Sequence, residues 1–257
     1  MKKIFLLLFL AILAFFTEVF GANPEGSILK KSIERSNARE IKTDISFFAG
    51  ELKIDGSTDE LAECFYGYKN NFIRPMMKYH EVGKTGYLII DSEKNRNRDI
   101  DDIGKDNEWQ LALNKNVRNS VSVELKAGEA NVDLEGFKLS RFEYRMMAGE
   151  SNINLKNTSV PSLYFSLTAG EANIDLSGKW KNDLTANIKG GVGELKIKLP
   201  YDVGIRVTVS GILGEINIPF FNRDGRTYTN DLYGKTANTL YIDINGGIGQ
   251  ISIEMVE

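Results

Sequence analysis

One short pattern recurs along this chain at a nearly constant interval, and it limits the folds that the chain can adopt. Each copy has a small or apolar residue, a glycine and then Glu or, in the last copy, Gln. The central glycines of five copies stand at positions 128, 149, 170, 193 and 214, so the successive spacings are 21, 21, 23 and 21. Two further copies are centred on Gly50 and Gly249. A period near 21 that is sustained over five copies is typical of a repeat architecture.

Apolar residues alternate with polar ones on both sides of each glycine. Before Gly128 the apolar residues include Val121 and Val123, at odd offsets, whereas Ala130 and Val132 follow it at even offsets. A period of two indicates strands with one buried face. The change of parity requires a bulge or corner, which glycine tolerates. We therefore expect a structural role for the seven corner glycines, Gly50, Gly128, Gly149, Gly170, Gly193, Gly214 and Gly249.

Two short strands and two corners in each glycine period fit one coil of a β-solenoid. One such coil cannot bury its apolar face alone, so stacked coils complete the core. The sequence predicts an all-β fold, specifically a right-handed, single-stranded, β-helix-like solenoid with coils of about 21 residues and irregular capping segments. A two-sheet sandwich is the alternative, because alternation alone does not fix topology. The constant spacing favours the solenoid, since hairpin-linked strands would show two-residue turns.

The N-terminus has the features of a secretory signal peptide. Lys2 and Lys3 precede an unbroken apolar run at 4–16, and Gly21 offers a small residue at the expected cut before Ala22. The run is shorter than a membrane span requires, so we expect cleavage of residues 1–21, with an uncleaved anchor as the alternative. No later apolar run is long enough for a membrane span, and the mature chain is expected to be exported to the periplasm, cell surface or extracellular space of a bacterium.

The rest of the chain is expected to frame the repeat. We interpret residues 22–40 as a linker and residues 41–257 as one domain whose first coil, 41–55, stands apart from the others. Two segments, 57–120 and 220–238, break the period and are expected to be irregular excursions or caps over the solenoid ends. The first contains strand-like pieces at 64–68, 76–82, 87–91 and 109–113, and a charged stretch at 93–108 that reads as an exposed loop.

Composition excludes several function classes. The chain has 1 Cys and 1 His, which allow no internal disulfide and too few nitrogen and sulfur ligands for a structural zinc site. A net charge of −3 gives no electrostatic reason to bind nucleic acid. We interpret Cys64 as a small buried hydrophobe and His80 as a surface or capping residue. No Gly-x-Ser-x-Gly elbow or phosphate-binding loop occurs, and we expect no enzymatic activity.

One ordered polar feature remains on the outward face of the repeat, which we call the polar strip. In-register stacking would place its glutamates in a column with steps of roughly 5 Å. The interpretation that we prefer is structural: each carboxylate accepts hydrogen bonds from corner N–H groups, and the amides bond along the ladder. The alternatives are a Ca²⁺ site, which oxygen ligands suit, and simple solvated repulsion. No other cofactor is expected. The candidate binding residues of the polar strip are Glu129, Asn131, Asp133, Glu150, Asn152, Asn154, Glu171, Asn173 and Asp175.

Three segments together resemble a known family. They are the Gly-Glu repeats, with Gly-Val-Gly-Glu at 191–194, the closing run at 228–234 that reads Tyr-Thr-Asn-Asp-Leu-Tyr-Gly, and the run at 246–251 that reads Gly-Gly-Ile-Gly-Gln-Ile. This arrangement resembles the toast-rack family from about residue 41 to the end. Related domains form the extracytoplasmic part of LiaF-type envelope-stress proteins and of candidate adhesins. The resemblance implies a β-helix-like domain outside the cytoplasm with no known enzymatic activity.

These observations leave three functional hypotheses. The first is a non-enzymatic cell-envelope domain that binds a protein, glycan or lipid partner in envelope maintenance or stress response. The second is a structural or adhesive surface protein, and the third is a polysaccharide lyase of the β-helix type. The third has the least support, because fold does not fix function and the lysines of the repeat stand apart from any acidic cluster. Aromatic residues outside the inward pattern are the expected anchors of a partner: Tyr66, Tyr68, Trp180, Tyr201, Phe220, Phe221, Tyr228 and Tyr233.

Overall fold

The computed structural model describes residues 27–68, 74–92 and 107–256, so the expected signal peptide and part of the charged stretch at 93–108 lie outside the described residues. Within these ranges no helix occurs, and fifteen strands form one sheet, which confirms the all-β prediction. The strands are β1 (Ser27–Ile33), β2 (Glu40–Asp55), β3 (Ala62–Tyr68), β4 (Pro75–Val82), β5 (Thr85–Ser92), β6 (Glu108–Leu113), β7 (Arg118–Asp133), β8 (Leu139–Asn154), β9 (Ser162–Asp175), β10 (Leu184–Lys189), β11 (Val192–Pro200), β12 (Gly204–Asn217), β13 (Asn222–Asp224), β14 (Thr227–Thr229) and β15 (Thr239–Val256).

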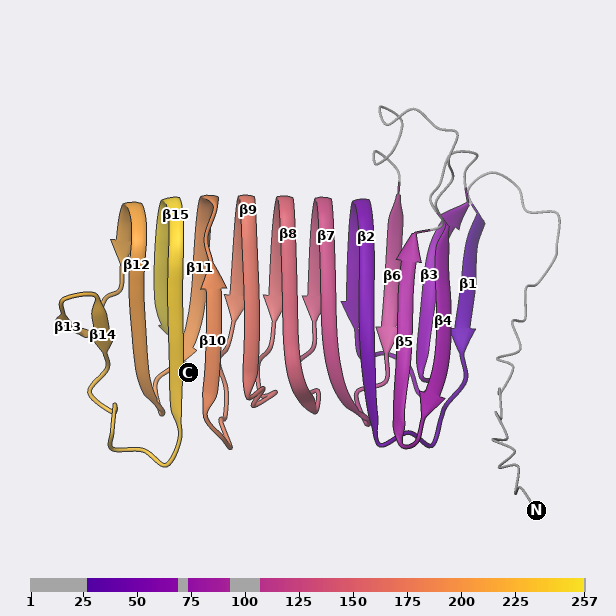
Figure 1. Cartoon of the computed structure of the whole chain (residues 1–257), viewed down its shortest axis with the longest axis horizontal. Helices are drawn as coiled ribbons and strands as arrows, with labels where there is room; N and C mark the ends of the chain where they lie inside the picture. Colours follow the sequence, from indigo (N-terminus) through magenta and orange to yellow (C-terminus); the bar gives the residue numbers. More distant parts are fainter. Residues whose placement is uncertain (1–26, 69–73, 93–106, 257) are drawn as a thin grey trace, which may run out of the picture.

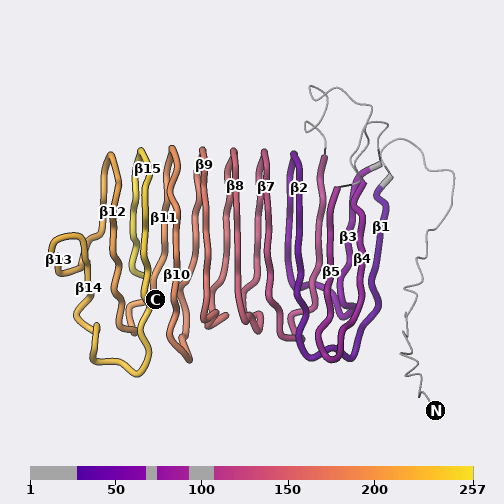
Figure 2. Tube along the Cα trace, viewed as in Figure 1, coloured from indigo at the N-terminus to yellow at the C-terminus, as the bar shows by residue number. Residues whose placement is uncertain are grey.

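The long strands form a row of bent layers. Each of β2, β7, β8, β9, β12 and β15 turns over at a corner, so it has a first limb before its central glycine and a second limb after it (Figure 1). Neighbouring layers pair in parallel along both limbs, with Gly128 opposite Gly149 and Gly149 opposite Gly170. In one layer the two limbs are separate strands, β10 and β11. The Cα trace shows the layers side by side along the long axis of the molecule (Figure 2).

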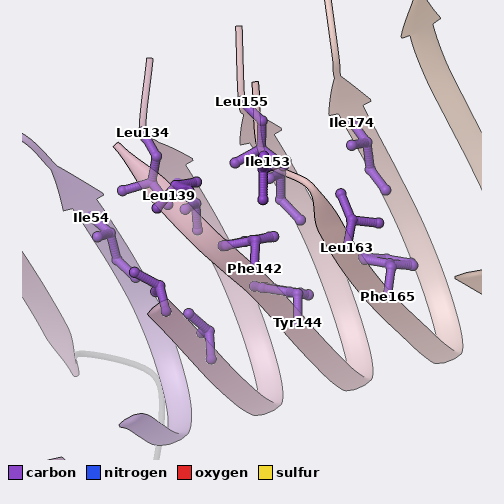
Figure 3. Packing of buried hydrophobic residues seen from close by; sticks show 14 of the residues in the cluster. Ile54, Leu134, Leu139, Phe142, Tyr144, Ile153, Leu155, Leu163, Phe165 and Ile174 are labelled. Atoms are coloured by element: carbon purple, nitrogen blue, oxygen red, sulfur yellow. The ribbon is translucent and has the colours of Figure 1, made fainter. Parts of the chain in front are cut away.

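The core lies between the two limbs of the layers. The alternation seen in the sequence places every second side chain inside, and the parity change at each glycine keeps both limbs facing the same core. Figure 3 shows apolar side chains of neighbouring layers meeting there. The rings of Tyr144 and Phe165 stack with centroids 5.7 Å apart, and the hydroxyl of Tyr144 shares a 2.6 Å hydrogen bond with Ser151 Oγ in the same interior. Successive layers thus bury the face that one layer alone would leave exposed.

Glycine at the corners is required by both conformation and space. All seven corner glycines have φ between +116° and +146°, a region that other L-residues rarely adopt. A Cβ atom on Gly149 would lie 2.9 Å from the carbonyl carbon of Gly128 and closer still to its oxygen. The same approach recurs from layer to layer, so the spacing of the stack depends on the missing side chain.

The N-terminal end of the stack is built from strands, and it corrects three expectations. β1 lies inside the expected linker 22–40, pairs antiparallel with β3 and buries Ile33. The four strand-like pieces expected in 57–120 are β3, β4, β5 and β6, so most of the described part of this segment is strand. β5 covers the first limb of β2, and β6 covers its second limb. The coil at 41–55 does not stand apart, because β2 also stacks directly on β7. The glycine period misses these end strands, because they lack the central glycine of the repeat.

Asn107 completes the corner at that end. Its carbonyl oxygen accepts a 2.8 Å hydrogen bond from Glu51 N–H, and its buried side-chain amide donates a 2.7 Å hydrogen bond to the carbonyl of Ala49. Asn107, directly before β6, thus takes at this corner the place that the next corner glycine takes elsewhere in the stack.

At the other end, β15 lies between the β10–β11 layer and β12, although β12 follows β11 in the chain. β14 then covers part of the first limb of β12, and β13 pairs with β14. The segment expected as an irregular excursion at 220–238 therefore contains two short strands.

Candidate functional site

The glutamates of the polar strip stand in one row, as expected. Glu129 lies opposite Glu150, and Glu150 lies opposite Glu171. All three are exposed, and no hydrogen bond or ion pair joins their carboxylates to another of the residues that the structure describes. The expected hydrogen bonds from corner N–H groups to these carboxylates are therefore not seen. The row thus presents a column of like charges to solvent.

The lysines near the ends of the row partner its outer glutamates. Glu51 is 2.9 Å from Lys53 Nζ, and Glu194 is 3.4 Å from Lys196 Nζ. Hydrogen bonds to Glu51 and then to Glu108 raise the pKa of Lys53 above its ordinary value. Both lysines are well exposed, so these pairs add little to stability, but they break the run of negative charge at its two sides.

The asparagines of the polar strip form a hydrogen-bonded ladder across three layers. Asn152 Nδ2 donates to Asn131 Oδ1 at 3.2 Å, and Asn173 Nδ2 donates to Asn152 Oδ1 at 2.9 Å. The ladder forms because in-register parallel strands place identical side chains one layer apart. All three side chains are exposed, so the same amides also face solvent.

The last row of the polar strip closes the turn at the end of each second limb. Asp133 Oδ1 accepts from Glu135 N–H at 3.1 Å, Asn154 Oδ1 accepts from Lys156 N–H at 3.0 Å, and Asp175 Oδ1 accepts from Ser177 N–H at 2.9 Å. Each is a side chain bonding to the backbone two residues on, which fixes the direction in which the chain leaves the strand. Asn154 Nδ2 also donates to Asp133 Oδ1 at 3.0 Å. This row therefore stabilises the turns, whether or not it also binds a ligand.

A groove runs along the same face, over the second limbs of five layers. It has a volume of about 370 Å³. The polar side chains that line it come from both the polar strip and two layers that the strip did not include: Asn131, Asp133, Asn152, Asn154, Asn173, Asp175, Lys196, Lys198, Ser252 and Glu254. The glutamates at 129, 150 and 171 stand beside it rather than in its lining. Register reasoning would have found the missed residues, because Lys196 lies opposite both Asn173 and Ser252.

The groove is suited to hydrogen bonding. Amides offer donors and acceptors, carboxylates accept, and the ammonium groups of Lys196 and Lys198 donate. Within the described ranges, no group of three or more His, Cys, Asp or Glu side chains is arranged to hold a metal ion. The oxygens of Asp133 and Asp175 are in part committed to turn N–H groups. A Ca²⁺ site on the strip remains a hypothesis for titration to test.

The other residues singled out from the sequence lie away from the groove. Cys64 is fully buried, and burial raises the pKa of its thiol because it disfavours the charged thiolate. Cys64 therefore packs as a small hydrophobic residue, as expected. His80 is exposed on β4 and stacks on Tyr87 with ring centroids 5.0 Å apart. Two of the expected aromatic anchors, Tyr66 and Tyr228, are buried. The side chain of Tyr68 lies outside the described residues. Trp180 and Phe221 pack against the core, whereas Tyr201, Tyr233 and Phe220 are exposed.

One aromatic cluster was missed. Tyr164 points outward from the first limb of β9, with the guanidinium of Arg145 5.1 Å and the ammonium of Lys189 5.7 Å from its ring centroid. Glu143 binds both Arg141 and Arg145 beside it. The outward position of Tyr164 between the inward Leu163 and Phe165 was the available signal.

Comparison with known proteins gives a family and one informative structure. A family model described as the N-terminal domain of toast_rack, DUF2154, matches residues 23–164 and 142–198. The chain is similar to a candidate cell adhesion protein from Clostridium sporogenes ATCC 15579, with 27% identity, 90% of this chain and 100% of that chain covered, and a TM-score of 0.69. No protein with a curated description matches the chain.

Two further structures are more distant. A candidate adhesin from Bacteroides fragilis NCTC 9343 and one from Parabacteroides merdae ATCC 43184 are each 13% identical, with TM-scores of 0.28. Each comparison covers 91% of this chain, with 100% and 98% of the other chains. Similarity at this level carries no argument about function. Separately, none of the described residues forms a helix long and apolar enough to cross a membrane.

Proposed function

This chain belongs to the toast-rack family, and from that premise we propose that it is a non-enzymatic adhesive protein of the bacterial cell surface that binds a hydroxyl-rich glycan along its groove. In this proposal residues 1–21 direct export and are removed, and residues 41–257 act as one domain. The stacked layers are the coils of a right-handed β-solenoid that repeats with the glycine period. They serve as a stiff scaffold, and the polar strip with the groove beside it is the working surface.

The similarity to the candidate cell adhesion protein of Clostridium sporogenes supports an adhesive role, because it extends over 90% of this chain at 27% identity. The composition is consistent with a surface that binds rather than reacts. The single Cys is buried, and the single His lies on β4 rather than in the lining of the groove.

The asparagine ladder is the observation that carries the choice of a glycan. Each asparagine amide has two N–H donors, and the ladder uses one from Asn152 and one from Asn173. No hydrogen bond within the described residues occupies Asn131 Nδ2 or Asn173 Oδ1. The ladder therefore presents spare donors and acceptors at fixed spacing, already ordered by their mutual bonds. Sugar hydroxyls both donate and accept, so they match such a row without demanding a charge.

The groove also argues against a strongly anionic ligand. Asp133, Asp175 and Glu254 line it alongside two lysines, so positive and negative groups are mixed. No aromatic side chain is among its lining residues. A neutral polymer lying across several layers would gain many weak hydrogen bonds while avoiding the desolvation cost of buried charges.

A matched pair of variants tests this function. Asn152→Ala removes the middle of the ladder, whereas Asn187→Ala removes an exposed asparagine from the outward face of β10, on the other limb. We expect Asn152→Ala to weaken retention of the mature chain on immobilised envelope polysaccharides about tenfold. The variant removes about two hydrogen bonds between the glycan and the spare donor and acceptor of Asn152, each worth roughly 0.5–1.5 kcal/mol. Asn187→Ala should bind as the unmodified chain does. Equal binding by both variants would show that the glycan does not bind in the groove.

Two further assays address the alternatives. Calorimetric titration with millimolar Ca²⁺ should give no heat and no rise in melting temperature if the strip is structural, and a clear response would support the calcium hypothesis. Incubation with acidic polysaccharides should release no unsaturated products. Their release, and its loss in a Lys196→Met or Lys198→Met variant, would support the lyase hypothesis instead.

A further inference from the structure

The C-terminal strand β15 occupies a place that the order of the chain does not predict. Its first limb pairs in parallel with β10 and with β12, and its second limb pairs in parallel with β11 and with β12. The strand therefore separates two layers that are consecutive in sequence. Figure 1 shows β15, in yellow, between the layer of β10 and β11 and the orange β12.

The glycine spacing from β11 to β12 equals the spacing between adjacent layers. From Gly128 to Gly149, and from Gly149 to Gly170, the chain advances one glycine period and one layer. From Gly193 to Gly214 it advances by the same period, but it crosses two layers. Two layer steps are roughly 9 to 10 Å, and residues 201–203 between β11 and β12 can span this distance or the shorter single step at about 3.3–3.6 Å per residue. Nothing in the length of this connection keeps β11 and β12 apart.

The two layers that β15 separates are also complementary to each other. Gly193 and Gly214 have φ of +138° and +146°, the corner conformation found throughout the stack. Through β15, Ala186 and Ile188 of the first layer stand in register with Val207 and Val209 of β12, so apolar rows would continue without β15. Direct contact of these layers would repeat the register that joins β7 to β8 and β8 to β9.

We propose that β12 stacks directly on the β10–β11 layer before β15 is in place, and that β15 enters by opening this contact. The C-terminal coil is then an inserted element. Before β15 enters, β12 covers the strand edges and the core face of the β10–β11 layer. Unpaired strand edges and exposed apolar side chains favour this contact as soon as β12 has formed. Entry of β15 exchanges one layer contact for two, and this gain drives the opening.

Engineered disulfides distinguish the two arrangements in the full mature chain. Lys196, Ser252 and Asn217 occupy the same outward row on β11, β15 and β12. In the final structure K196C/S252C joins adjacent layers, whereas K196C/N217C spans two layers, beyond the roughly 4.4–6.8 Å Cα separation of a disulfide. With β15 outside the stack, the second pair becomes adjacent. N131C/N173C is the matched control, because its residues are also two layers apart but have β8 between them.

The measurement is a pulse of oxidant at increasing times after refolding begins. Mass spectrometry identifies each disulfide, so that pairs with the native Cys64 are scored separately. Cross-linking of each pair in concentrated guanidinium chloride gives its random-chain level and corrects for loop length. We expect K196C/N217C to rise about tenfold above that level early and to fall as K196C/S252C rises. The early cross-linked species should also expose residues 239–256 to protease.

The result that would overturn the proposal is clear from the control. If K196C/N217C follows N131C/N173C at every time, then β11 and β12 do not meet before β15 enters. Early and maximal cross-linking of K196C/S252C would likewise contradict it, because β15 would then join β11 at the start of folding.

Discussion

Replacing one corner glycine by alanine tests the physical basis of the stack. Gly149 is the sharpest site, since it lies in the middle of the regular layers at φ +134°. The alanine Cβ would lie 2.9 Å from the carbonyl carbon of Gly128 and 3.0 Å from its nitrogen, with the oxygen closer still. These are backbone atoms, so no side-chain rotation can relieve the contact. The two layers must separate locally.

The expected cost has two parts. A non-glycine residue in the left-handed region costs roughly 1–2 kcal/mol. Separation of the layers at the corner breaks about three backbone hydrogen bonds at roughly 1 kcal/mol each. We therefore expect Gly149→Ala to lower the free energy of unfolding by about 4–5 kcal/mol, which places it among the most disruptive single substitutions.

Two control substitutions separate these parts. Gly136 has φ +70° but no atom within 4 Å of the position that an alanine Cβ would take, so Gly136→Ala should cost only the conformational part, about 1–2 kcal/mol. Gly67 has open space and no positive φ, so Gly67→Ala should change stability by less than about 1 kcal/mol. Urea unfolding followed by circular dichroism gives the three values. Equal losses for Gly149→Ala and Gly136→Ala would refute the close-approach argument.

Three further predictions concern other features of the stack. Asn107→Ala should destabilise the chain by about 1–3 kcal/mol in urea unfolding, because it leaves the buried carbonyl of Ala49 without its donor; a change within error would show that the corner is satisfied in another way. Burial raises the pKa of the Cys64 thiol and of the Tyr144 phenol, so the folded chain retains protons that the unfolded chain releases. The free energy of unfolding should therefore keep its full value below about pH 8. It should fall as the pH rises through the pKa values of these two groups in the unfolded chain, about 8.5 and 10. A urea midpoint that stays constant from pH 7 to 10.5 would contradict this. Glu150→Gln should raise stability by about 0.5 kcal/mol in low salt, through relief of repulsion in the glutamate row, and 1 M salt should abolish the gain.

The repeat in the sequence predicted the layers because each physical requirement of the layers determines a separate feature of the sequence. Positive φ required glycine, burial required alternation, and a shared core required the parity change at each corner. The same sequence features could not predict the order of the layers. Gly193 and Gly214 have the spacing of adjacent coils, and only the structure shows β15 between them.

The N-terminal end shows a different limit. Asn107 replaces a glycine corner by using its side-chain amide and its carbonyl, so no period could reveal it. The sequence predicts a linker where β1 lies, because a short edge strand with mixed polarity has no distinctive pattern. Its partner β3 decides its conformation, and that contact is remote in sequence.

The candidate site was predicted in part. Identical spacing implied that the asparagines would align, and the ladder at Asn131, Asn152 and Asn173 is what in-register strands produce. The expected hydrogen bonds to the glutamates were not found, because these side chains extend into solvent rather than folding back to the corner. Lys196 and Lys198 lie opposite Asn173 and Asp175, so the repeat spacing that aligns the asparagines also places these lysines in the groove.

Carboxylate footprinting of the mature chain with bound polysaccharide shows whether a glycan lies in the groove. Carbodiimide labelling read by mass spectrometry reports each exposed carboxylate separately. A glycan in the groove should protect Asp133, Asp175 and Glu254, while Asp44, exposed on the first limb of β2, should label as in the free chain. Protection of Asp44 without the groove residues, or no protection at any of the four, would contradict the account.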